Sequence, residues 1–101
     1  MIKRNVVSAD ELKLEIDGDL TGANAQELSQ ELESVLSESY KTLTLEMTET
    51  TAINSASIGR ILLARKKYKD ANIGIRIVGC SDVIYEALTS LNLDRLISVR
   101  K

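Results

Sequence analysis

The strongest constraint on the fold is a strand-like segment that leads directly into a helix-like one. Leu43, Leu45 and Met47 alternate with polar residues, and this period of two predicts a β-strand. Apolar residues then recur at helical spacing up to about Asp70, which predicts an α-helix. Residues 52–60 therefore join a strand to a helix. A chain that repeats this arrangement is expected to form βαβ units.

Strand and helix patterns alternate along the rest of the chain. Strand patterns occupy residues 2–7, 12–16, 41–47 and 73–78, with a weaker one at 96–99. Amphipathic helices are expected at residues 24–37, 55–70 and 81–91. This order predicts an α/β fold, with amphipathic helices packed on a mixed, mostly parallel sheet of four to five strands. The first two strands are expected to pair as an antiparallel hairpin, in a single domain spanning residues 1–101.

Two of the predicted helices begin with residues suited to capping. Asn24 and Glu27 have the spacing of a capping box, which predicts Asn24 as the N-cap of the first helix. Ser81 is expected to cap the third helix through its hydroxyl.

Composition narrows the classes of function. The formal net charge is −2 and no basic stripe is present, which argues against a nucleic-acid partner. The chain has no histidine, the commonest general base and metal ligand, so neither a metal or cofactor site nor an enzyme is predicted. The single cysteine, Cys80, excludes an internal disulfide and is expected to be a small packing residue. No signal-peptide pattern or membrane-spanning run is found, so a cytoplasmic protein without membrane insertion is expected.

Asn54 and Ser55 stand where the loop turns into the second helix. Either side chain could cap that helix through its oxygen. A helix N-terminus also attracts anions, because free backbone N–H groups and the helix dipole point at it. From the residues alone, Ser55 is therefore either a plain cap or a serine placed to carry a phosphate.

The pattern as a whole resembles the STAS fold, in particular the stand-alone anti-sigma factor antagonists of bacteria, over nearly the whole chain. The matching segments are Gly18-Asp19-Leu20-Thr21, Ala25-Gln26-Glu27-Leu28, Leu43-Thr44-Leu45-Glu46-Met47, Ile53-Asn54-Ser55-Ala56-Ser57-Ile58-Gly59 and Gly79-Cys80-Ser81. The fourth of these lies over the signature Asp-Ser-Ser/Ala-Gly-Leu-Gly of the family.

The resemblance implies a protein-binding switch rather than an enzyme. In the family, the serine that aligns with Ser55 is phosphorylated by an anti-sigma factor serine kinase, and a serine phosphatase reverses the modification. The unmodified antagonist binds the anti-sigma factor and frees a sigma factor, which controls transcription indirectly. The implied partner-binding residues are Thr21, Asn24, Asn54, Ala56, Ser57, Ile58 and Arg60.

This sequence departs from the family pattern at three positions. Asn54 and Thr21 stand where the family usually has Asp, and Ser57 replaces a Gly and adds a second hydroxyl near Ser55. The alternative hypothesis is therefore an unregulated STAS scaffold, or an accessory subunit of a signalling complex or an ABC-type lipid transporter. The sequence leaves open whether the chain forms a homodimer.

Overall fold

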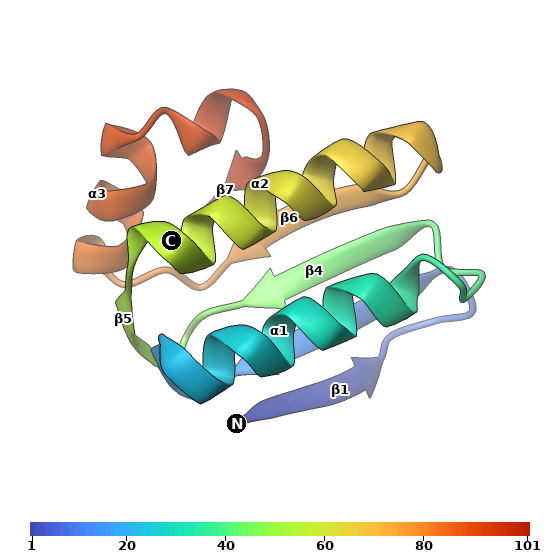
Figure 1. Ribbon diagram of the computed structural model, residues 1–101, viewed down its shortest axis with the longest axis horizontal. Helices are drawn as coiled ribbons and strands as arrows, with labels where there is room; N and C mark the ends of the chain where they lie inside the picture. The colour runs from blue at the N-terminus through green and yellow to red at the C-terminus, as the bar shows by residue number, and fades with distance from the viewer.

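The computed structural model describes all residues from 1 to 101, arranged as helices packed against a sheet (Figure 1). The strands are β1 (Ile2–Val6), β2 (Glu11–Ile16), β3 (Gly18–Leu20), β4 (Thr42–Glu46), β5 (Thr50–Ile53), β6 (Gly74–Val78) and β7 (Ser98–Val99). The helices are α1 (Gly22–Val35), α2 (Ser55–Asp70) and α3 (Asp82–Ser90), followed by the short 3₁₀ helix η1 (Leu93–Arg95). None of these helices combines the length and the apolar character needed to cross a membrane.

The main sheet has five strands in the order β1-β2-β4-β6-β7. β1 and β2 are antiparallel, and every other pair in this sheet is parallel. The parallel strands follow one another in a single direction across the sheet, so right-handed crossovers pass over the same face each time. Figure 1 shows α1 and α2 side by side over that face, while α3 packs against β5 near the start of α2. The predicted fold class and the hairpin are confirmed.

The core lies between this face of the sheet and the helices. It is one cluster of 21 buried residues and is almost entirely aliphatic. Along β2, buried Leu12, Leu14 and Ile16 alternate with half-buried charged residues, as the period of two predicted. Tyr68 of α2 is fully buried, and its hydroxyl donates to the carbonyl oxygen of Leu32 in α1 at 2.7 Å. Burial raises the pKa of this phenol, so it stays a neutral donor that joins the two helices.

The opposite face of the sheet is polar and holds a small ionic network. Arg76 Nη2 donates to Glu11 Oε2 at 2.8 Å, and the Thr44 hydroxyl donates to the same oxygen at 3.1 Å. These two donors hold the pKa of Glu11 below its usual value. The carboxylate therefore contributes to stability above its ordinary pKa, and the contribution is lost as the pH falls through the lowered value.

The structure differs from the sequence prediction around β3 and the start of α1. β3 pairs with β5 in a separate two-stranded sheet, and no strand was predicted for either segment. The prediction of Asn24 as an N-cap is wrong, because α1 begins at Gly22 with Thr21 as its N-cap. The Asn24 amide instead donates to the carbonyl oxygens of Asp17 at 3.2 Å and Asp19 at 2.8 Å. Asn24 thus joins the first turn of α1 to β3 and to the residue between β2 and β3.

Candidate functional site

Pairing of β3 with β5 places the starts of two helices next to each other. The strands are parallel, and Leu20 at the end of β3 pairs with Ile53 at the end of β5. The next residue in each segment is an N-cap, Thr21 for α1 and Asn54 for α2. Both helices therefore begin at the same edge of this small sheet, and each directs the positive end of its dipole there.

A buried threonine joins the small sheet to the main one, and a glycine helps to hold the small sheet together. The Thr50 hydroxyl donates to the carbonyl oxygen of Ile16 at 3.0 Å, and Gly18 N–H donates to the Glu49 carbonyl oxygen at 3.0 Å. Sequence reasoning missed this role of Thr50. The only signal was the threonine-rich stretch of residues 48–51, since β-branched residues favour strands.

Asn54 and Ser57 together form the cap of α2. Asn54 Oδ1 accepts from Ser57 N–H at 2.9 Å, and the Asn54 N–H donates to Ser57 Oγ at 3.2 Å. The Ser57 hydroxyl also donates to the Asn54 carbonyl oxygen at 2.8 Å. These contacts complete a capping box, and Ser57 is fully buried in it.

Ser55 is the first residue of α2, is exposed, and takes no part in the cap. Its hydroxyl makes no hydrogen bond within the protein. The backbone N–H groups of Ser55 and Ala56 also lack a partner in the chain, as expected for the first turn of a helix. No acidic residue lies in that turn. The hypothesis that Ser55 caps the helix is therefore wrong, and its hydroxyl remains available for covalent modification.

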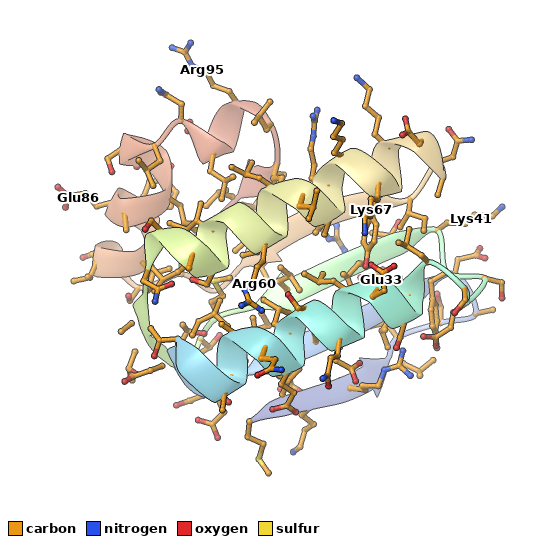
Figure 2. The ribbon with its side chains drawn as sticks, in the orientation of Figure 1. Glu33, Lys41, Arg60, Lys67, Glu86 and Arg95 are labelled. Atoms are coloured by element: carbon orange, nitrogen blue, oxygen red, sulfur yellow. The ribbon has the colours of Figure 1, made fainter.

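The remaining predicted site residues divide into accessible and inaccessible ones. Asn54, Ala56 and Arg60 are exposed around Ser55, whereas Thr21 and Asn24 are half-buried. Arg60 points from α2 toward α1, where it donates to Ser29 Oγ at 3.1 Å (Figure 2).

Two of the predicted partner-binding residues need correction. Ser57 is fully buried in the cap, and Ile58 is only 5 % exposed in the hydrophobic core. Neither side chain can contribute to a docking surface in this structure, contrary to the prediction. Ser57 is likewise no second candidate hydroxyl, since it already bonds to the Asn54 backbone.

Cys80 lies away from the surface, after β6. It is 5 % exposed, and burial raises the pKa of its thiol. A thiol that resists ionisation is a poor nucleophile, so these features agree with its predicted role in packing.

The different roles of Asn54 and Ser55 at the start of α2 lead to a testable prediction. Asn54→Ala should lower the free energy of unfolding by about 1 kcal/mol, because it removes the side-chain cap. Ser55→Ala should change it by less than about 0.5 kcal/mol, because the Ser55 hydroxyl has no partner to lose. Urea denaturation of both variants checks this. A larger loss for Ser55→Ala than for Asn54→Ala would contradict the assignment of the cap.

Gly59 occupies the exposed side of α2, one turn after Ser55. Its backbone is helical, and a Cβ built there would meet no atom within 4 Å. Nothing within the chain requires glycine at this position. We therefore expect Gly59→Ala to raise the free energy of unfolding by about 1 kcal/mol, since glycine is a poor helix former. Calorimetry should show a melting temperature about 4–8 °C higher. A lower melting temperature would reveal a packing constraint that the structure does not contain.

Comparisons with known proteins agree with this architecture. The family model for the STAS domain matches residues 3–101. No curated protein sequence matches the chain significantly.

Several solved structures share the fold at low sequence identity. The Thermotoga maritima protein TM1081, named as a candidate anti-sigma factor antagonist, superposes with a TM-score of 0.88 at 20% identity, over 99% of this chain and 86% of that one. The anti-sigma factor antagonist SpoIIAA in its unphosphorylated form superposes with a TM-score of 0.86 at 9% identity, over 100% of this chain and 89% of that one. The Bacillus SpoIIAA in its phosphorylated form has a TM-score of 0.78 at 9% identity, over 100% of this chain and 92% of that one. A sulfate transporter family protein from Wolinella succinogenes has a TM-score of 0.77 at 20% identity, over 95% of this chain and 80% of that one. These likenesses establish the fold, and the family model covers nearly the whole sequence, so this chain belongs to the STAS domain family.

Proposed function

We propose that this protein is an anti-sigma factor antagonist, a protein-binding switch that is controlled by phosphorylation of Ser55. One observation carries the proposal. The Ser55 hydroxyl is exposed and unbonded at the start of α2, while Asn54 and Ser57 provide the cap. A kinase can therefore modify Ser55 without breaking any interaction that holds the helix.

The comparisons support this proposal at the level of the family. SpoIIAA is named as an anti-sigma factor antagonist and has been solved in both unphosphorylated and phosphorylated forms. The corresponding partners here would be an anti-sigma factor serine kinase and a serine phosphatase.

The switch works by local electrostatics. A phosphoserine carries a charge of about −1.5 to −2 at neutral pH. At a helix N-terminus this charge faces free N–H groups and the positive end of the dipole, so the fold tolerates it. A partner docked over the same spot must bury the charge or oppose it with its own groups, which costs several kcal/mol. Binding is therefore lost without a conformational change.

The proposed docking surface surrounds Ser55. Exposed Asn54, Ala56 and Arg60 belong to it, and half-buried Thr21 and Asn24 border it at the start of α1. Ser57 and Ile58 act only indirectly, since they hold the first turn of α2 in place.

Intact mass spectrometry tests the phosphoacceptor. Incubation with the cognate anti-sigma factor kinase and ATP should add one phosphate, about 80 Da, and fragmentation should place it on Ser55. Serine phosphatase should remove the added mass. The matched control Ser55→Ala should stay unmodified. An unmodified wild-type protein, or the same added mass on Ser55→Ala, would reject the proposal.

A second candidate function follows from Asn54. The amide oxygen of Asn54 supplies the cap that a carboxylate would supply, but without the negative charge usual in the family. A STAS domain that serves as an unregulated scaffold or a transporter subunit has no need of that charge. Co-purification with an ABC-type ATPase in place of a serine kinase would favour this function.

A further inference from the structure

The positive charge of this protein is concentrated on one helix. α2 carries five of the 13 basic residues and a single carboxylate, whereas the rest of the chain carries eight basic residues and fourteen acidic ones. Most of the cations on α2 are not neutralised within the chain. Lys67 pairs with Glu33 of α1 at 3.1 Å, and Arg60 donates only to uncharged oxygens. Arg65, Lys66 and Lys69 form no ion pair.

Two further residues on this helix are suited to contact with another protein. Leu63 is 56% exposed. Gly59 lies one turn before it on the same side of α2, and no contact within the chain explains a glycine there. A glycine in a helix lets another backbone approach closely, and an exposed leucine offers an apolar contact. Spacings of four residues place Ser55, Gly59 and Leu63 along one side of α2.

We propose that a partner protein with an acidic surface docks on this side of α2. We call this surface the α2 docking face and define it by Ser55, Gly59, Arg60, Leu63, Lys66 and Lys67. The backbone of the partner approaches closely at Gly59, an apolar side chain of the partner covers Leu63, and its carboxylates face Arg60 and Lys66, which have no carboxylate partner in the chain. Charge complementarity selects the partner and accelerates its association.

The inference deepens the proposed function and rests on it for one step. If Ser55 is phosphorylated, the new negative charge stands at the head of a face that is otherwise cationic. Carboxylates of the partner that are attracted to Lys66 and Arg60 would then meet a like charge. One phosphate at the edge of the surface would therefore be enough to release an acidic partner.

The structure argues against a second copy of this chain that docks symmetrically through α1 and α2. The neighbouring helix α1 turns its carboxylates Glu27 and Glu31 toward β1, where Glu31 pairs with Arg4 at 3.0 Å. Its exposed carboxylate beside α2, Glu33, already pairs with Lys67 at 3.1 Å. Helix α1 of a second copy would therefore offer little unpaired negative charge to the α2 docking face.

Site-specific photo-crosslinking in the native host tests the location and chemistry of the surface. Benzoylphenylalanine is placed at position 63, and at Arg95 of η1 as the control. Arg95 points away from the two helices in Figure 2. We expect position 63 to crosslink one protein through a peptide rich in Asp and Glu, and Arg95 not to crosslink it. A crosslink to nucleic acid, to a second copy or to a basic peptide overturns the proposal, and so does the absence of any crosslink at position 63.

Affinity measurements with that purified protein then test the individual residues. Gly59→Gln and Lys66→Glu should each weaken binding at least about tenfold, whereas Arg95→Glu should leave it unchanged. Gly59→Gln favours the helix, so its effect cannot be ascribed to unfolding. Unchanged affinity in both α2 variants overturns the proposal. If these variants weaken binding but phosphorylation of Ser55 does not, the docking face stands and the proposed switch fails. If phosphorylation of Ser55 weakens binding but the two α2 variants do not, the proposed switch stands and the α2 docking face is rejected.

Discussion

Ser55→Asp should weaken binding of the partner about 100-fold, which corresponds to about 2.7 kcal/mol. The carboxylate places a negative charge where the unmodified protein has a neutral hydroxyl. This charge repels the acidic surface of the proposed partner. The same charge lies at the N-terminus of α2, so the free energy of unfolding should stay unchanged or rise by up to about 0.5 kcal/mol. Calorimetric titration with the purified partner and urea denaturation of the variant measure the two quantities.

Ser55→Asn is the matched control, because it is close in size to Asp and uncharged. It should keep the affinity within about threefold of the wild type, since a surface contact without charge contributes little. Equal losses for Asp and Asn would mean that bulk rather than charge disrupts docking. An unfolding free energy that drops sharply for Ser55→Asp would mean that the helix start cannot carry the charge.

The largest effect on stability is expected at Leu14 in β2. Its side chain is fully buried between the sheet and the helices. Leu14→Ala should lower the free energy of unfolding by about 2–5 kcal/mol, because it removes apolar contacts and leaves a cavity. Urea denaturation followed by circular dichroism measures the change.

Lys13→Ala tests whether the helices cover only one face of the sheet. Lys13 is the neighbour of Leu14 in β2, is half-buried on the opposite face, and forms no ion pair. Its replacement should cost less than about 0.5 kcal/mol. A cost similar to that of Leu14→Ala would contradict the one-sided arrangement.

The sequence predicted the elements whose pattern reflects burial on one side. The alternation in β2 and β4 and the helical spacing in α2 arise because one face of each element packs against a common core. The mostly parallel order followed from strands that alternate with amphipathic helices. Ser81 was also predicted correctly as the cap of α3, since a side-chain cap depends on residues close in sequence.

The features that could not be predicted depend on contacts between distant segments. β3 has three residues and β5 has four, too few to show a period, and they exist because they pair with each other. Asn24 resembled an N-cap because a local pattern cannot reveal that its amide bonds to Asp17 and Asp19 instead.

The same limit applied inside the candidate site. The family resemblance selects Ser55 as the phosphoacceptor, but the local sequence alone does not show which of Ser55 and Ser57 has a free hydroxyl. The structure shows it, since Asn54 binds Ser57 and leaves the Ser55 hydroxyl without a partner. Ile58 was grouped with the surface by its place in the matching segment, whereas helical geometry turns it into the core.

The most direct test of the account is an amide NMR spectrum of the protein with phosphoserine installed at position 55 by codon suppression, compared with the spectrum of the unmodified protein. We expect shifts confined to the first turn of α2 and the adjacent turn between β3 and α1, with every other amide signal unmoved. Shifts spread through α3 and the main sheet, or a collapse of spectral dispersion, would contradict the claim that Ser55 carries a phosphate without disturbing the fold.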